Sequence, residues 1–151
     1  MSDSSKDLMV HINKDWENIY ETLCRGSDSI FDQMTSLFCL CASIGHLNRD
    51  SRNVNNRQGK FRWGNLNQET ETTILSAIAW DHEKRDLQVL SDRKRIIEIS
   101  CGYAEGGMQY LYENFFEDYM VNGQLNRPDK LDIEFNLAQI IEGLRQQQSL
   151  F

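Results

Sequence analysis

Residues 91–119 contain the feature that most constrains this fold, a long amphipathic helix interrupted by glycines. Six apolar residues recur there at alternating steps of four and three, namely Ile97, Cys101, Ala104, Met108, Leu111 and Phe115. This spacing puts all six on one stripe of an α-helix. Gly102, Gly106 and Gly107 lie among them, although each Gly costs a helix interior about 1 kcal/mol relative to Ala. We therefore predict either a close approach to the helix backbone or a bend at this point.

Tyr103 and Glu105, the polar residues between these glycines, suggest a recognition surface. Gly102 and Gly106 form a G-x-x-x-G pair, which in helices permits close helix contact. Tyr103 and Glu105 lie off the apolar stripe, and we interpret them as polar markers of a recognition surface beside the glycines.

The rest of the chain also favours helices. Apolar residues recur at helical spacing in residues 5–24, 29–45, 67–80 and 131–147, with Gly45 as a candidate C-cap for the second of these. The sequence has a single proline and no convincing strand pattern. A chain of 151 residues fits one domain. We predict an all-α fold, with five or six helices in a single domain spanning residues 1–151.

A long basic loop is predicted at residues 46–66, which are rich in Asn, Arg and Gly. Loops of this length in a domain are uncommon and usually functional or disordered. Such loops can hold phosphates, stack on bases, or contact proteins. The candidate binding residues are the cations and aromatic rings of this loop, Arg49, Arg52, Arg57, Lys60, Phe61, Arg62 and Trp63.

A second basic group, Arg93, Lys94 and Arg95, begins the long helix. Cations in the first turn are unfavourable because the N-terminal end of the helix dipole is positive. A departure from this preference with no evident compensation invites a functional explanation. The chain has a net charge of −7, yet residues 49–95 hold ten basic and seven acidic side chains. This overall charge argues against avid non-specific DNA binding but allows a localised basic patch.

Several kinds of catalytic site are disfavoured. Cys39 and Cys41, followed by His46, have no second ligand pair that would complete a tetrahedral metal site. The 102–107 run lacks the Gly-Lys-Ser/Thr ending of a phosphate-binding loop. A pairing of Cys101 with a distant histidine stays open, since such pairs form in space rather than in sequence. We expect no metal, no cofactor and no catalytic residue.

The chain's location is predicted to be cytoplasmic. No apolar run approaches the roughly 20 residues needed to span a bilayer. The N-terminal segment is polar and acidic and lacks the apolar core of a signal peptide. The four cysteines lie within apolar helical patterns, so we interpret them as buried hydrophobic residues in a reducing compartment.

Three motifs resemble one protein family. They are the Leu37-Phe38 to Gly45 helix, the apolar run at residues 74–79, and the run at residues 97–111 that contains Tyr103-Ala104-Glu105-Gly106-Gly107. Together they resemble Dnd system-associated protein four, a family of small proteins encoded in bacterial DNA phosphorothioation islands. The resemblance spans about residues 36–119. It implies an accessory component of an antiphage defence or DNA-modification operon, and it brings no catalytic residues.

Two functions follow as expectations. The first is a non-catalytic accessory subunit that docks onto a larger ATPase or nuclease subunit through the basic loop and the 102–107 helix face, in a hetero-oligomer. The second is a nucleic-acid-binding regulator that contacts DNA through the same loop and the Arg93, Lys94 and Arg95 group. An enzyme ranks third.

Overall fold

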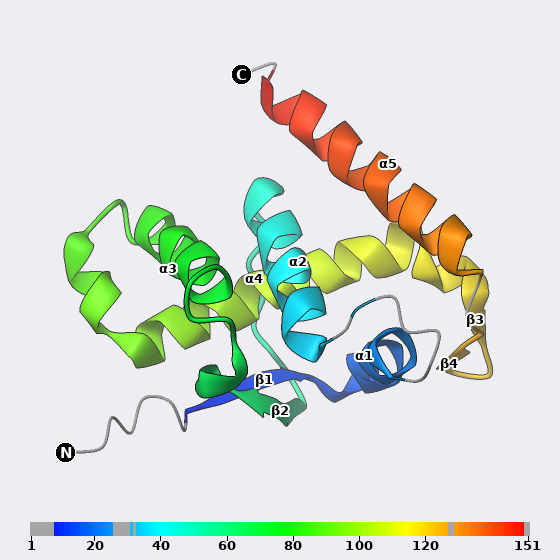
Figure 1. Cartoon of the computed structure of the whole chain (residues 1–151), viewed down its shortest axis with the longest axis horizontal. Helices are drawn as coiled ribbons and strands as arrows, with labels where there is room; N and C mark the ends of the chain where they lie inside the picture. The colour runs from blue at the N-terminus through cyan, green and yellow to red at the C-terminus, as the bar shows by residue number, and fades with distance from the viewer. Residues whose placement is uncertain (1–7, 26–30, 32, 127–128, 150–151) are drawn as a thin grey trace.

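The longest helix, α4 (Arg93–Asn114), runs through the middle of the molecule, and the other elements lie around it (Figure 1). The computed structural model describes residues 8–25, 31, 33–126 and 129–149. All six residues of the apolar stripe are buried. So is every residue from 99 to 108, which means that this part of α4 is enclosed on all sides rather than along one stripe.

Helix α2 (Met34–Leu47) packs directly on the backbone of α4. A Cβ added to Gly107 would collide with the Cys41 carbonyl of α2, and one added to Gly45 would collide with the Tyr103 carbonyl of α4. Gly45 therefore lies inside α2 as a contact residue. The prediction that it caps this helix is wrong, because the C-cap is Asn48.

The loop after α2 covers a neighbouring face of α4. A Cβ on Gly106 would collide with the Asp50 carbonyl, and one on Gly102 would lie 2.7 Å from the Ser51 hydroxyl oxygen. The backbone N–H of Arg52 donates a hydrogen bond to the Gly102 carbonyl at 3.0 Å. The glycines thus let a helix and a loop both rest on the α4 backbone.

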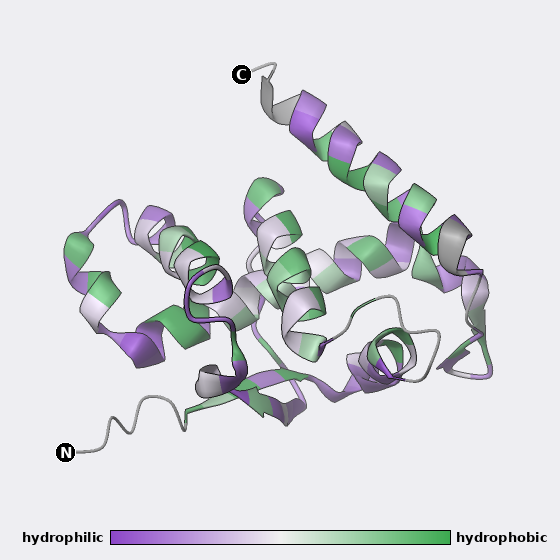
Figure 2. Cartoon of the chain, viewed as in Figure 1, coloured by the Kyte–Doolittle hydropathy of each residue, from purple (hydrophilic) through white to green (hydrophobic). Residues whose placement is uncertain are grey.

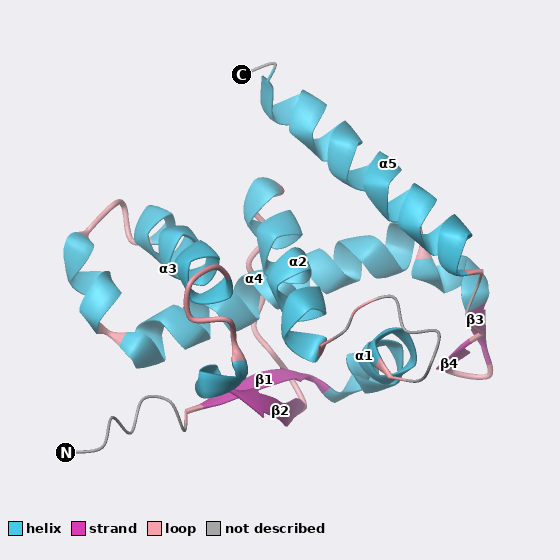
Figure 3. Ribbon diagram, viewed as in Figure 1, coloured by secondary structure: helices cyan, strands magenta, loops and turns pink. Residues whose placement is uncertain are grey.

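An antiparallel pair of strands lies against the helices (Figure 3). Strand β1 (Met9–Asn13) pairs with β2 (Arg57–Arg62), and the register shifts between Val10 and His11. The backbone N–H of Trp63 extends the pairing by donating to the Leu8 carbonyl at 2.8 Å. This pairing joins the start of the chain to the segment predicted as a loop.

The all-α prediction is therefore corrected to a mostly α-helical fold with two small two-stranded sheets. Residues 9–13 belong to a strand rather than to the first predicted helix, because Val10 and Ile12 are buried in alternation with more exposed neighbours. The prediction of a loop over residues 46–66 is wrong for its second half, which forms β2 and the 3₁₀ turn η3 (Trp63–Asn65).

The remaining helices follow the predicted order. The structure has helices α1 (Glu17–Cys24), α3 (Glu71–His82) and α5 (Lys130–Ser149), strands β3 (Met120–Val121) and β4 (Gln124–Leu125), and 3₁₀ turns η2 (Lys14–Trp16), η4 (Leu87–Ser91) and η5 (Phe116–Tyr119). The Asn67 side chain accepts hydrogen bonds from the N–H groups of Glu69 and Thr70, at 2.9 and 3.0 Å. It therefore ties down the turn that leads into α3.

Helix α5 is amphipathic, and hydrophobic and hydrophilic residues alternate along it in Figure 2. Ile133, Leu137 and Leu144 are buried, as the helical pattern predicts. Ile141 and Phe135, in the same helix, are 39% and 64% exposed. The four cysteines are free and buried, which confirms their interpretation as core residues.

Candidate anion-binding pocket

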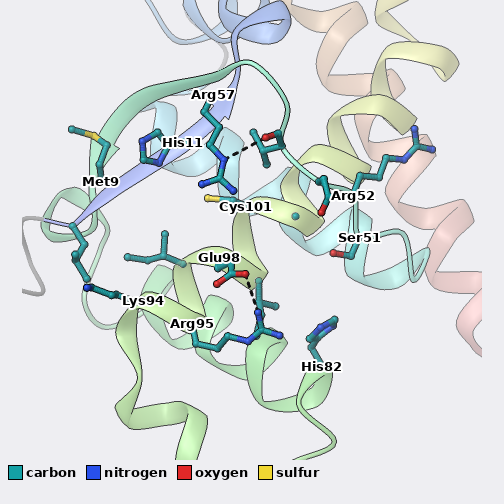
Figure 4. Close-up of a pocket in the computed structure, with 16 residues that line it drawn as sticks. Met9, His11, Ser51, Arg52, Arg57, His82, Lys94, Arg95, Glu98 and Cys101 are labelled. Atoms are coloured by element: carbon teal, nitrogen blue, oxygen red, sulfur yellow. Dashed lines mark hydrogen bonds and ion pairs between the residues drawn. The ribbon is translucent and has the colours of Figure 1, made fainter.

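A pocket of about 520 Å³ opens where the two predicted basic segments meet (Figure 4). Its walls come from β1, from the 51–57 segment after α2, and from the first turns of α4. The lining residues are Leu8, Met9, His11, Ser51, Arg52, Asn53, Val54, Arg57, His82, Lys94, Arg95, Ile97, Glu98, Ile99, Cys101 and Gly102. Pockets of this size are typical of small-molecule sites, roughly 300–1,000 Å³.

Four of the predicted cations line this pocket; in Figure 4 the Arg57 guanidinium reaches into it, whereas the Arg52 side chain points away from the other three. Arg52 and Arg57 come from the segment between α2 and β2, whereas Lys94 and Arg95 come from the first turn of α4. The two groups are about forty residues apart in the sequence. Their convergence creates a locally basic pocket on a protein whose net charge is −7.

Two of these cations are already matched by carboxylates. Arg52 Nε donates to both oxygens of Asp50, at 2.9 and 3.1 Å. Arg95 Nε lies 2.6 Å from a Glu83 oxygen, and its guanidinium also pairs with Glu98 at 3.2 Å. The hydrogen bonds to Asp50 and Glu83 raise the pKa of Arg52 and Arg95 respectively. Both guanidinium groups are therefore held in defined orientations.

The other two cations are not matched in this way. Arg57 Nε donates only a long hydrogen bond, 3.4 Å, to the Val54 carbonyl. Within the described part of the chain, neither Arg57 nor Lys94 has a carboxylate within ion-pair distance. The pocket consequently carries positive charge that no described acidic side chain neutralises.

The floor of the pocket is apolar. Val54 and Ile97 are buried there, and the Cys101 thiol lies beneath the Arg57 guanidinium in Figure 4. Burial raises the pKa of Cys101 to about 11, although the backbone at His11 and the charge of Arg57 oppose this effect. The thiol is therefore protonated at neutral pH and is a poor nucleophile.

Three predicted binding residues are in the protein interior, and their assignment is corrected. Trp63 is 1% exposed, and Phe61 is 9% exposed and packs edge-on against Phe38. The Lys60 ammonium is buried between Glu17 and Glu21, 3.0 Å from an oxygen of each. Neither ring presents a face for bases or a partner, and the lysine is neutralised internally.

The remaining predicted cations lie outside the pocket. Arg49 is exposed, with a left-handed backbone conformation (φ 53°). Arg62 is exposed on β2. The Arg93 guanidinium lies over the Trp63 ring, 5.1 Å from its centroid, so this cation–π contact covers the buried indole. Of the three, Arg49 and Arg62 present cations at the surface.

The predicted recognition surface at residues 102–107 is an internal contact. Tyr103 and Glu105 are 8% and 9% exposed. Glu105 accepts hydrogen bonds from Trp16 Nε1 at 3.0 Å and from Asn13 Nδ2 at 3.3 Å. Burial raises the pKa of this carboxyl group, and the two hydrogen bonds oppose the rise. Glu105 therefore links α4 to the N-terminal segment, and neither side chain faces a partner.

Two histidines lie beside the pocket in a role that the sequence did not predict. His82 lines the pocket, and its Nδ1 lies 2.7 Å from the Tyr103 hydroxyl. His46 packs edge-on against the same tyrosine ring and hydrogen-bonds Asp81 at 2.9 Å. That hydrogen bond lowers the pKa of Asp81. No local pattern marks these residues, because only the packing of α2, α3 and α4 brings them together.

The described residues contain no group of three or more His, Cys, Asp or Glu side chains placed to hold a metal ion. None of the helices in the described ranges is both long enough and apolar enough to cross a membrane.

The chain matches a known protein family. A family model described as DNA sulphur modification system-associated protein 4 matches residues 9–126, which run from β1 through β4. The resemblance drawn from the three sequence motifs is thereby confirmed. No curated protein and no solved structure matches the chain.

Proposed function

The chain belongs to the DNA sulphur modification system-associated protein 4 family, and on this premise we propose that it is a non-catalytic accessory subunit of such a system. In this role it docks onto a larger ATPase or nuclease subunit and forms a hetero-oligomer with it. The partner presents an apolar surface bordered by acidic side chains.

The state of the cysteines supports a non-catalytic role. Burial raises the pKa of Cys24, Cys39 and Cys41 to about 12, and that of Cys101 to about 11. A cysteine nucleophile works as the thiolate, which needs a depressed pKa. A Cys–His nucleophile, the enzymatic reading that the sequence leaves open, is therefore not favoured.

The observation that carries the docking proposal is an exposed leucine pair beside the basic turn of α4. Leu87 and Leu90, on η4, are 69% and 45% exposed. Side chains three residues apart eclipse each other in a 3₁₀ helix, so these leucines share one face. Exposed Lys94 follows four residues later. An apolar centre with a charged border is the usual composition of a protein interface.

The basic loop contributes to the same docking role through its exposed members. Arg49 and Arg52 remain at the surface, whereas Lys60, Phe61 and Trp63 do not. The 102–107 helix face is internal and is not part of the docking surface.

Affinity purification tests the proposal. The chain, tagged and expressed from its own operon, should co-elute with a larger subunit at moderate salt. Replacing Leu87 and Leu90 by Ser and Arg49 by Ala should remove that subunit while leaving the circular dichroism spectrum unchanged. A matched control on α5 replaces exposed Phe135 and Ile141 by Ser and Arg145 by Ala, and it should retain the subunit. Retention by both variants would refute the docking surface.

The alternative of binding along an extended nucleic acid strand is not favoured. Such surfaces combine a basic groove with aromatic platforms on which bases stack. Here the candidate rings of Phe61 and Trp63 are buried. What remains available for an anionic ligand is the pocket itself.

A further inference from the structure

The pocket has two features of a ligand site that the docking role does not use, the Arg57 guanidinium and an apolar hollow beside it. It lies in a concave region, and two of its cations, Arg57 and Lys94, have no carboxylate partner among the described residues. Basic residues on a flat, solvated face need no further explanation. Cations gathered from two segments around an apolar hollow are better explained by an anionic ligand.

The cations suit a phosphate group. Arg52 and Arg95 are oriented by Asp50 and by Glu83 and Glu98. A guanidinium presents a planar fork of N–H donors that matches the oxygens of a phosphate. Arg57 and Lys94 add charge that is free to pair with the ligand. A phosphate ester beside Arg57 would therefore meet unneutralised positive charge, with the oriented Arg95 guanidinium lining the same pocket.

The rest of the lining suits an attached nucleoside. Leu8, Val54 and Ile97 provide apolar surface beside the cations. Met9 is 39% exposed at the edge, and its thioether makes favourable contacts with aromatic rings. Glu98, across the pocket from Arg57 in Figure 4, is an acceptor for hydroxyl or amino donors. Inorganic phosphate would use neither the apolar surface nor this acceptor.

We propose that this pocket binds a nucleoside phosphate, with the phosphate at Arg57 and Lys94 and the nucleoside over Val54 and Ile97. The ligand is either a free nucleotide or the terminal nucleotide of a DNA strand. The proposal goes beyond the docking role, because it depends on Arg57 and the apolar lining of the pocket and not on Leu87, Leu90 or Arg49. Lys94 and Arg52 belong to both surfaces.

Calorimetric titration of the purified full-length chain tests this proposal. The probes are the four deoxynucleoside 5′-monophosphates, the corresponding nucleosides, and inorganic phosphate. At least one monophosphate should bind about tenfold more tightly than inorganic phosphate. The nucleosides should bind no more tightly than inorganic phosphate does. Arg57→Ala and Lys94→Ala should each weaken binding by about 10- to 100-fold, the usual effect of losing a charge-assisted hydrogen bond.

Matched variants control for non-specific attraction. Lys14→Ala and Arg145→Ala remove exposed cations outside the pocket and should leave the affinity unchanged. Arg57→Lys keeps the charge but loses the fork, so it should recover only part of the affinity. Equal weakening by the four alanine variants, with Arg57→Lys keeping the full affinity, would overturn the proposal, because it would indicate diffuse charge attraction.

Oligonucleotides distinguish the two sources of the ligand. A short single strand with a 5′-phosphate that binds in an Arg57-dependent way, when its 5′-hydroxyl counterpart does not, identifies a strand end. Binding of monophosphates alone identifies a free nucleotide. If no phosphate probe binds at millimolar concentration, or if an Asp/Glu-rich peptide binds at Arg57 instead, the proposal is wrong. These assays contain no partner subunit, so their failure is distinct from failure of the docking role.

Discussion

Substituting Gly107 by Ala should measure how closely α2 and α4 are packed. The added Cβ would collide with the Cys41 carbonyl oxygen and lie 2.6 Å from its carbon and 3.0 Å from Cys41 Cα. All three atoms belong to the backbone of α2, so no side-chain rotation relieves the overlap. The helices would have to separate until these contacts reach 3.4 Å, where ordinary van der Waals contact begins.

The expected cost follows from two opposing terms. Overpacking a well-packed core typically costs 1–3 kcal/mol, and a rigid backbone obstruction puts this site at about 3 kcal/mol. Ala in place of Gly recovers about 1 kcal/mol of helix propensity. We therefore expect Gly107→Ala to lower the free energy of unfolding by about 2 kcal/mol. For a chain of this size, that lowers Tm by about 4–8 °C.

Gly143→Ala provides the matched comparison. Gly143 lies inside α5, and nothing is within 4 Å of its added Cβ. Only the propensity term applies there, so this variant should be about 0.5–1 kcal/mol more stable than the parent. Urea denaturation followed by circular dichroism measures both variants. A Gly107→Ala protein as stable as Gly143→Ala would refute the close-packing argument.

Three further predictions concern buried polar groups. Lys60→Met should lower the free energy of unfolding by about 1–2 kcal/mol, because Glu17 and Glu21 lose their shared cation but can still reach water; an unchanged urea midpoint would contradict this. Burial raises the pKa of Glu105, so the stability this residue contributes is fully present below the unfolded pKa and is lost as pH rises through the folded one. When the pH is raised through 4.5, the ordinary pKa of a glutamate, the urea midpoint of Glu105→Gln should therefore fall less than that of the parent. Equal falls in the two proteins would show that Glu105 does not cause this pH dependence. Because burial raises the pKa of the four thiols to about 11–12, iodoacetamide at pH 8 should label them only after unfolding, as intact mass would show; rapid labelling of native Cys101 would indicate an accessible thiolate.

The helices could be predicted because their signal is local. The spacing of residues such as Ile97, Cys101 and Ala104 is set by the geometry of a single helix, and the buried stripe of α4 has the predicted members. The same holds for Ile133, Leu137 and Leu144 in α5. The glycines marked a close approach, but their spacing did not say which segment makes it.

The strand pair could not be predicted from either strand alone. In β1 the spacing of Leu8, Ile12 and Trp16 also fits a helix, so the alternation of Val10 and Ile12 was not decisive. In β2 only Phe61 is buried, and the remaining residues are polar or glycine. Strand preference reflects packing against a partner more than intrinsic backbone preference. Each segment becomes a strand because the other is there.

The candidate site was predicted in its charge but not in its geometry. Arg52, Arg57, Lys94 and Arg95 were all candidates, and the pocket brings them together. Lys60, in the same loop, is neutralised in the interior. An Arg-rich and aromatic composition does not tell which side chains face water, because that depends on how β2 pairs with β1.

The family, the mostly helical character, the buried cysteines and the central stripe of α4 could all be predicted from the sequence. These depend on residue type and on spacings within one turn or two of a helix. The packing of distant segments buries Trp63 and Glu105, places His82 beside Tyr103, and brings the two basic segments to one pocket. Those outcomes depend on contacts between residues far apart in the chain, which local periodicity does not encode.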